Sequence, residues 1–179
     1  MLVGGGTLDA PHCEVGFMVL PQRKPNRLLH FDYSTPGAYF VTICTQGRKC
    51  ILGEIVGGGT FDAPKMQLSH IGNIVYGHIL SGNKVVGVRV DKFVIMPNHI
   101  HIILLVDPSA AIGSTPANAV IPRFISAFKR FSHRDAGFSF FQRSYHDHII
   151  RSEKDYLEIW QYIDNNPAKW EEDCFYRQE

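Results

Sequence analysis

The most informative stretch of this chain is Met96-Pro97-Asn98-His99-Ile100-His101-Ile102-Ile103-Leu104-Leu105. Its proline and asparagine predict a turn, and the apolar run after them is typical of a strand. Side chains alternate between the two faces of a strand, so His99 and His101 point to one face while Ile100 and Ile102 point to the other. Two imidazoles side by side on a rigid strand can bind one divalent metal ion, although a bare His-x-His pair fits an ordinary structural role equally well.

Strand-like and helix-like segments around this stretch define the fold class. Apolar, β-branched and aromatic residues predict strands at 37–46, 50–56, 85–95 and 99–106, and an extended segment at 140–150. Apolar residues at helical spacing predict helices at 67–80 and 120–132. A last helix is expected to begin after Ser152 as N-cap and to end near Asn166, because Pro167 follows. This order predicts an α+β domain, an antiparallel sheet with helices packed on it.

Composition and charge place the chain among ordinary globular proteins. Its residues are 45% hydrophobic and 12% aromatic, and a single domain of 179 residues can bury a real core. No apolar stretch approaches the roughly 20 residues that cross a bilayer, and no secretory signal or C-x-x-C pairing is visible. We therefore expect a cytoplasmic protein with no membrane partner. The net charge of +1 hides a basic segment, residues 121–151, which fits a polyanion footprint or equally a solvated helix face.

Two near-copies of one nonapeptide are present, Val3-Gly-Gly-Gly-Thr-Leu-Asp-Ala-Pro11 and Val56-Gly-Gly-Gly-Thr-Phe-Asp-Ala-Pro64. Two copies are too few for a solenoid. A phosphate-binding loop would require a G-K-[ST] sequence after the glycines, and neither copy has one. We therefore interpret both copies as insertions at tolerant positions, one in an N-terminal extension and one in a hairpin loop.

The last predicted helix supplies groups that the histidine pair lacks. Tyr162 and Asn166 are four residues apart and so share one face of that helix. A tyrosine hydroxyl has a pKa of about 10 and becomes a useful nucleophile when it lies in line with an electrophile whose charge a metal manages. An amide oxygen of Asn166 would complete a three-ligand site with His99 and His101. Taken alone, Tyr162 fits a buried core tyrosine better.

These motifs, taken in order, resemble the REP-associated tyrosine transposases, a branch of the single-tyrosine HUH transposases. The resemblance covers residues 23–170 and rests on Phe31-Asp-Tyr-x-x-Pro-Gly-Ala-Tyr-Phe-Val-Thr-Ile-Cys-Thr45, Leu52-Gly-Glu-Ile55, Val94-Ile-Met-Pro-Asn-His-Ile-His101, Tyr145-x-x-His-Ile-Ile-Arg151 and Tyr162-Ile-x-x-Asn-Pro167. It implies a ferredoxin-like antiparallel sheet with helices packed on it, the architecture of HUH nucleases. It also implies that His99 and His101 hold Mg²⁺ or Mn²⁺, that Tyr162 is the nucleophile, and that Asn166 is a third metal ligand.

The activity implied by the resemblance is that of a metal-dependent single-stranded DNA transposase or nickase. Such an enzyme cleaves and rejoins DNA at hairpin-forming repeats through a 5′-phosphotyrosine intermediate. The alternative is a catalytically silent protein that binds DNA hairpins with the same fold. A weaker alternative is a metal-dependent hydrolase unrelated to DNA, which would use the histidine pair with a water nucleophile. We expect six basic residues to contact phosphates: Arg23, Lys24, Arg27, Lys129, Arg130 and Arg134.

Three segments are predicted along the chain. Residues 1–22 form a flexible N-terminal extension, residues 23–170 form the transposase domain with its Gly-rich insert at 56–64, and residues 171–179 form a C-terminal tail. The partner implied is single-stranded or hairpin DNA of palindromic repeats, in a bacterial cytoplasm and associated with the nucleoid. Monomer and homodimer both stay open. A second His-x-His, His146-Asp147-His148, has no nucleophile partner in the family pattern, and we interpret it as structural or DNA-facing.

Overall fold

The structure is a computed structural model, and it describes residues 35–59, 62–82, 87–108 and 119–176. The strands are β1 (Gly37–Cys44), β2 (Gly53–Val56), β3 (Lys65–Leu68), β4 (Val88–Ile95), β5 (His99–Val106) and β6 (His146–Ile150). The α-helices are α1 (His70–Gly82), α2 (Val120–Ala136) and α3 (Glu153–Asn165), and two 3-10 helices are η1 (Gln46–Arg48) and η4 (Pro167–Glu172). The predicted N-terminal extension and the predicted DNA contacts Arg23, Lys24 and Arg27 lie outside the described residues.

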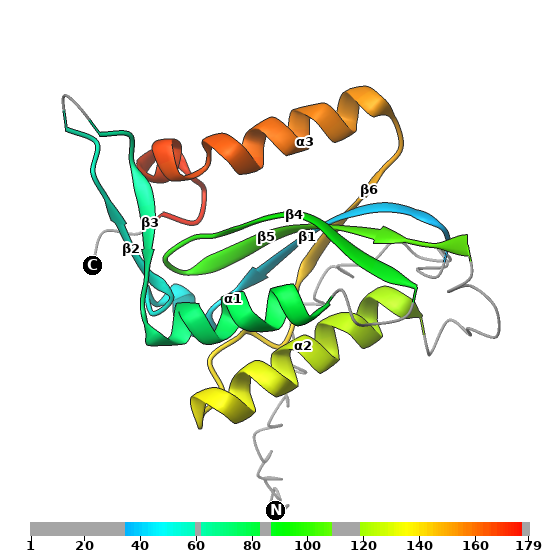
Figure 1. The fold of residues 1–179 in the computed structure, drawn as a ribbon, viewed down its shortest axis with the longest axis horizontal. Coiled ribbons are helices and arrows are strands. Elements are labelled where there is room, and N and C mark those ends of the chain that lie inside the picture. Colours follow the sequence, from blue (N-terminus) through cyan, green and yellow to red (C-terminus); the bar gives the residue numbers. More distant parts are fainter. Residues whose placement is uncertain (1–34, 60–61, 83–86, 109–118, 177–179) are drawn as a thin grey trace, which may run out of the picture.

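Four strands form the main sheet in the order β4-β5-β1-β6, and every neighbouring pair is antiparallel (Figure 1). Two β-α-β units, β1-α1-β4 and β5-α2-β6, interleave to give this order. The two strands of each unit run parallel with one strand between them, so a helix must carry the chain back across the sheet. This arrangement confirms the predicted α+β, ferredoxin-like fold.

The two faces of the sheet carry different helices, since α1 and α2 cover one face and α3 lies over the other (Figure 1). Alternate residues of the central strands are buried with apolar residues of α1 and α2 in one core, which includes Val41, Ile43, Ile100, Ile102, Val75, Ile79, Phe124 and Ile125. Full burial of each such side chain contributes about 1.5–3 kcal/mol. The remaining alternate residues, His99 and His101 among them, face α3, as the alternation predicts.

A two-stranded hairpin of β2 and β3 leaves the main sheet between β1 and α1. β3 is absent from the predicted elements, because a four-residue strand with a single partner gives too short a pattern. Helix α1 accordingly begins three residues later than predicted, at His70, where Ser69 Oγ accepts a hydrogen bond of 3.0 Å from the Gly72 amide. The segment that connects β2 to β3 is the Gly-rich insert.

The ends of α3 follow from local signals in the sequence. Ser152 Oγ accepts a hydrogen bond of 3.1 Å from the amide of Asp155, and the acidic side chains of Glu153 and Asp155 lie in the first turn, where the helix dipole favours them. The helix ends at Asn165, just before Pro167. Both ends agree with the prediction. No helix within the described residues is long and apolar enough to cross a membrane.

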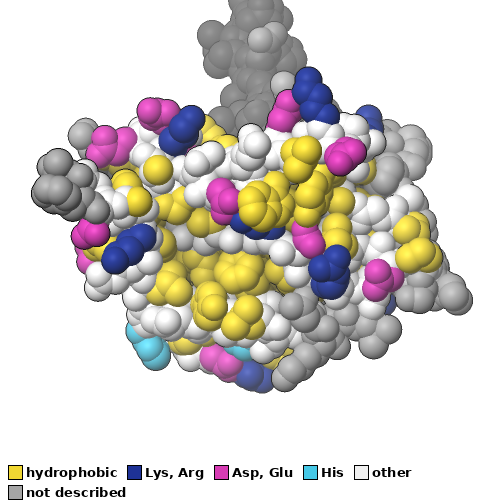
Figure 2. Space-filling model, turned by 45° about the horizontal axis from the view of Figure 1, so that its top comes forward, with side chains coloured by type: hydrophobic (Ala, Val, Ile, Leu, Met, Phe, Trp, Pro, Cys, Tyr) yellow, Lys and Arg dark blue, Asp and Glu magenta, His cyan; other side chains and the backbone are white. Residues whose placement is uncertain are grey.

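Strand β4 forms one edge of the main sheet and anchors α3 to it. Its pairing with β5 shifts register between Val90 and Lys92, which leaves a bulge at Asp91. The Asp91 carboxylate accepts hydrogen bonds from Arg89 and from the Tyr156 hydroxyl of α3. Lys92 pairs with Asp164 and lies 3.1 Å from the centre of the Trp160 ring. Figure 2, in which the α3 side comes forward, shows hydrophobic side chains gathered among charged ones on this face.

Candidate metal and tyrosine site

The two histidines of β5 lie together in the interior of the protein. His99 and His101 are 0% and 1% exposed, and their Nε2 atoms are 2.9 Å apart. In the ladder, His99 lies opposite Cys44 and His101 opposite Thr42 of β1. The strand therefore presents two imidazole nitrogens to a single point, which is the arrangement that a shared metal ion requires.

The outer nitrogen of each imidazole has a hydrogen-bonding partner. Asn98 Oδ1 lies 2.9 Å from His99 Nδ1, and Thr42 Oγ1 lies 2.8 Å from His101 Nδ1. Such partners fix the ring orientation of metal-binding histidines and raise their basicity. Because Nδ1 is occupied in both rings, Nε2 is the nitrogen left for a ligand.

Helix α3 brings Tyr162 to the histidine pair. Ile163, 1% exposed, anchors the helix in the interior, and the Tyr162 ring packs edge-on against Phe40 with ring centres 6.1 Å apart. The Tyr162 hydroxyl lies 3.2 Å from His101 Nε2. Tyr162 itself is 40% exposed, so the structure places it at the boundary between the histidines and solvent rather than in the core.

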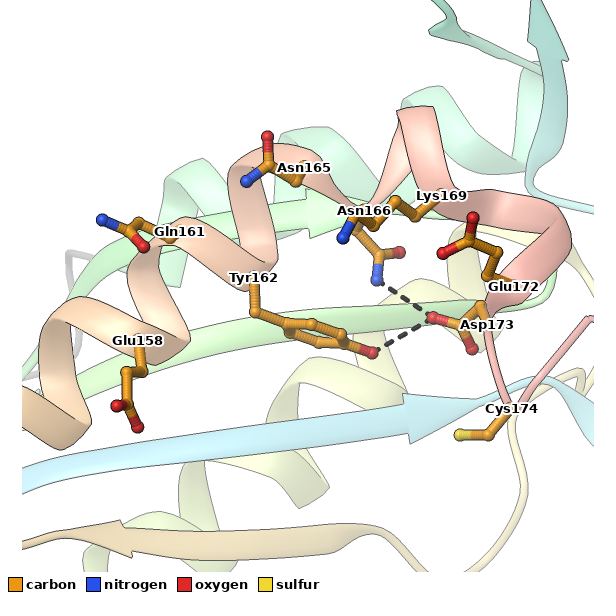
Figure 3. Close-up of a pocket in the computed structure, with 9 residues that line it drawn as sticks. All are labelled: Glu158, Gln161, Tyr162, Asn165, Asn166, Lys169, Glu172, Asp173 and Cys174. Atoms are coloured by element: carbon orange, nitrogen blue, oxygen red, sulfur yellow. Dashed lines mark hydrogen bonds between the residues drawn. The ribbon is translucent and has the colours of Figure 1, made fainter.

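Asp173 is a site residue that the sequence reasoning missed. Its Oδ2 accepts hydrogen bonds from the Tyr162 hydroxyl (3.1 Å) and from Asn166 Nδ2 (3.0 Å), as Figure 3 shows, and it lies 4.0 Å from His99 Nε2. Ligand atoms of His99, His101 and Asp173 all lie within 4.8 Å of one another. The residue falls in the predicted C-terminal tail, yet the chain folds back after η4 and makes this segment part of the site.

Asn166, the predicted third ligand, lies beside Asp173 and is 2% exposed. Its Nδ2 donates to the carboxylate, while its Oδ1 is buried with no hydrogen-bonding partner among the described residues. A buried amide oxygen without a partner is costly, and a cation would satisfy it. The two imidazole nitrogens and one carboxylate that lie together suit Mn²⁺ and are compatible with Mg²⁺, so the residues present fit the implied metal.

The C-terminal segment covers the histidines, and a cavity lies beside Tyr162. The rings of Trp170 and Phe175 lie 5.9 and 4.6 Å from the His99 ring, centre to centre. Between α3, η4 and Cys174 lies a cavity of about 470 Å³, and Tyr162 and Asn166 line it (Figure 3). A substrate therefore has access to the tyrosine side of the site.

Burial controls the protonation of the site. It lowers the pKa of His99 to about 4 and that of His101 well below its usual value, so both imidazoles are neutral at pH 7, the form that binds metals. Burial, and next the Asp173 carboxylate, raise the pKa of Tyr162 well above its usual value. The phenolate is therefore strongly disfavoured unless positive charge is brought close to it.

Lys129, a predicted DNA contact, is largely buried. It is 9% exposed, and its Nζ donates hydrogen bonds to the carbonyl oxygens of Gln142 (2.8 Å) and Ser144 (2.9 Å). Burial lowers its pKa to about 8. Its donors are directed at main-chain carbonyls, so this lysine holds the segment before β6 in place.

The other predicted basic residues of α2 lie away from the tyrosine. Arg130 and Arg134 are exposed, and both guanidinium groups lie over the Phe131 ring. Helix α2 packs on the face of the sheet opposite α3 (Figure 1), so the structure does not bring these arginines to the histidine–tyrosine site. His148 of the second His-x-His lies 2.9 Å from Asp155 and fastens β6 to the start of α3, which is a structural role.

Comparisons with known proteins place the chain in a family and identify a shared fold. No protein-family model matches it. A protein of Haemophilus influenzae, described as uncharacterized, is 34% identical over an alignment of 175 residues, and the match covers 86% of this chain and 93% of that protein. The chain belongs to the same family. The solved structure of a REP-associated tyrosine transposase bound to a REP hairpin is similar with a TM-score of 0.60, over 83% of this chain and 74% of that one. At 18% identity this likeness shows the fold alone.

Proposed function

We propose that this protein is a metal-dependent single-stranded DNA transposase or nickase that cleaves and rejoins DNA at hairpin-forming repeats. The observation that carries the proposal is the contact of the Tyr162 hydroxyl with His101 Nε2 at 3.2 Å and with Asp173 Oδ2 at 3.1 Å. A tyrosine, two histidines and a carboxylate meet at one point although they come from separate parts of the chain. The fold shared with a hairpin-bound tyrosine transposase supports DNA as the substrate class.

The proposed reaction is a transesterification at phosphorus. Tyr162 Oη forms a bond to the phosphorus of a phosphodiester, and the bond from phosphorus to the 3′ oxygen breaks. The products are a 5′-phosphotyrosine and a free 3′-OH, whose proton comes from solvent. The hydroxyl proton of Tyr162 has an acceptor already in place, the Asp173 carboxylate. A 3′-OH of a second strand reverses the step, because the covalent intermediate keeps the bond energy.

The histidines and the two polar groups beside Tyr162 would hold the metal. His99 and His101 would supply their Nε2 atoms and Asp173 a carboxylate oxygen. We propose the unpartnered Oδ1 of Asn166 as a further ligand. A bound Mg²⁺ or Mn²⁺ supplies charge stabilisation at the scissile phosphate and favours the phenolate. The remaining phosphate contacts are proposed for Arg130 and Arg134 and, outside the described residues, for Arg23, Lys24 and Arg27.

The direct test is a covalent-adduct assay. The full chain is incubated with a 5′-labelled and a 3′-labelled single-stranded hairpin oligonucleotide in Mn²⁺ or Mg²⁺. We expect a denaturation-resistant protein–DNA species that carries the 3′ label, disappears with Tyr162→Phe and persists with Tyr156→Phe. Tyr156 is the matched control because it lies on the same helix and its hydroxyl is bound to Asp91 instead. An adduct that survives Tyr162→Phe would refute the assignment, and binding without any adduct would identify the silent hairpin-binding alternative.

One observation favours a second candidate function. Two histidines and one carboxylate are also the three protein ligands of some catalytic zinc sites, which hold a water molecule in the fourth position. A metal-dependent hydrolase would release a free 5′-phosphate or 3′-phosphate end and would retain activity in Tyr162→Phe. The adduct assay therefore separates the two functions on the same gel.

A further inference from the structure

The two histidines differ in what their outer nitrogens contact. His99 Nδ1 meets the side-chain amide of Asn98 at 2.9 Å, whereas His101 Nδ1 meets the hydroxyl of Thr42 at 2.8 Å. An amide oxygen can only accept a hydrogen bond, but a hydroxyl both donates and accepts and can rotate. The two imidazoles are thus held by partners of different chemical capability.

The orientation of the Asn98 amide is fixed by the chain around it. Asn98 is 0% exposed, and its Nδ2 donates to the carbonyl oxygens of Phe175 (2.9 Å) and Arg48 (3.2 Å). Both hydrogens of Nδ2 are therefore used, and a flipped amide would point its oxygen at two carbonyls. Asn98 Oδ1 must face His99 and accept from it, so His99 carries its proton on Nδ1 and leaves a lone pair on Nε2.

This assignment decides the protonation of His101 in the metal-free protein. The two Nε2 atoms are 2.9 Å apart, and two lone pairs at that distance would repel each other. Since His99 Nε2 carries a lone pair, His101 Nε2 carries a proton and donates it to His99. His101 Nδ1 is then an acceptor, and the hydroxyl of Thr42 donates to it.

A shared metal ion needs lone pairs on both Nε2 atoms. We propose that Asn98 holds His99 permanently in the metal-binding tautomer, while the Thr42 hydroxyl lets His101 change tautomer when the metal arrives. His101 Nε2 gives its proton to water, Nδ1 takes one from water, and the Thr42 hydroxyl rotates from donor to acceptor. The neutral imidazole gains and loses one proton, so its net charge is unchanged. Asn98 and Thr42 are positioning residues, and their assignment rests on the proposed metal site.

The experiment reads the tautomers directly. Long-range ¹H–¹⁵N correlation spectra of the ¹⁵N-labelled full chain distinguish a proton on Nδ1 from one on Nε2, and single His→Gln variants assign the two rings. Without metal we expect His99 protonated on Nδ1 and His101 on Nε2. With saturating Mg²⁺ we expect both rings protonated on Nδ1. A proton on Nε2 of His99, or a His101 ring that keeps its tautomer in Mg²⁺, overturns the proposal.

Variants separate positioning from structural support. Thr42→Val removes the hydroxyl at nearly constant volume and should weaken Mg²⁺ binding about 10- to 100-fold, the usual effect of losing such a partner, while Thr42→Ser restores it. Asn98→Asp keeps the acceptor for His99 but loses both donors, so it should destabilise the protein yet keep the His99 tautomer. Asn98→Ala should both destabilise the protein and release the His99 tautomer. Equal Mg²⁺ binding by Thr42→Val and Thr42→Ser contradicts the proposal.

A control variant, just after the end of strand β1, is Thr45→Val. The buried hydroxyl of Thr45 donates to the carbonyl oxygens of Lys49 (2.8 Å) and Asn98 (3.0 Å) and touches neither imidazole. It should lower stability without altering either tautomer or Mg²⁺ affinity. If the spectra show the stated tautomers but the adduct assay shows no covalent DNA, the proposed function fails while the positioning roles stand.

Discussion

The two faces of strand β5 have the same backbone and opposite surroundings. On one face, Ile100 and Ile102 are buried among the apolar side chains of α1 and α2. On the other face, His99 and His101 are buried just as completely, but among hydrogen-bonding groups of β1, α3 and the C-terminal segment. Equal burial therefore surrounds one face with apolar side chains and the other with hydrogen-bonding groups, and one strand fixes the geometry of both.

The largest effect on activity is expected from removing the two imidazoles of the polar face of β5. His99→Ala with His101→Ala should reduce adduct formation on a hairpin oligonucleotide by roughly a thousandfold, because metal stabilisation of the transition state is worth several kcal/mol. The double variant should retain the circular dichroism spectrum and a cooperative unfolding transition. A variant that forms adduct at the normal rate would show that the histidines are only structural.

The matched change on the apolar face is Ile102→Ala. Loss of a fully buried isoleucine side chain should lower the free energy of unfolding by about 2–5 kcal/mol, through lost burial and the cavity left behind. Urea titration measures it. At temperatures where the variant is folded, its Mg²⁺ affinity should equal that of the natural chain. A large loss of metal binding without a loss of stability would contradict the division between the faces.

The polar face should also make stability depend on pH in metal-free protein. Burial lowers the pKa of His99 to about 4, and an unfolded histidine has a pKa of about 6.5. The unfolded state therefore binds more protons between these values, so stability is fully present above pH 6.5 and is lost as the pH falls toward 4. His99 contributes about 3 kcal/mol to this loss, and His101 acts in the same direction. Urea titrations in EDTA at several pH values from 7.5 to 4.5 measure this loss. The free energy of unfolding of His99→Gln should depend less steeply on pH than that of the natural chain.

The smallest effects are expected on α2, where Lys129 and Arg130 are adjacent. Lys129→Met leaves main-chain carbonyls without a donor and should cost about 1–3 kcal/mol of unfolding free energy, with DNA binding unchanged in the folded protein. Arg130→Met should leave stability within about 0.5 kcal/mol. If Arg130 contacts a phosphate, its variant weakens DNA binding a few-fold and lowers the salt dependence of the affinity. Weaker DNA binding by Lys129→Met, with unchanged DNA binding by Arg130→Met, would instead identify Lys129 as the DNA contact.

Much of the fold could be predicted because the signals are local. Alternation along residues 99–105 gives the two faces of β5, and Ser152 with Pro167 gives both ends of α3. The four-residue spacing of Tyr162 and Asn166 correctly places them side by side, since both now contact the same carboxylate. These relations depend on the periodicity of one element, which the sequence carries directly.

The parts that could not be predicted depend on contacts between distant segments. Asp173 acquires its role only when the chain after η4 folds back over β5, and nothing in its neighbourhood distinguishes it from other acidic residues near the C-terminus. Lys129 lies at the boundary of the apolar face of α2, and the carbonyl oxygens that occupy it come from residues 142–144. Strand β3 exists because β2 pairs with it, not because of its own pattern.

The bulge in β4 also affects whether two copies of the chain can pair through their edge strands. An edge strand offers unpaired amide and carbonyl groups to any other strand, and regular spacing of those groups is what permits pairing. The register shift at Asp91, with the charges of Arg89 and Lys92 beside it, interrupts that spacing. A continuous sheet across two molecules through β4 is therefore disfavoured, and this edge is protected against the strand-to-strand association that begins aggregation.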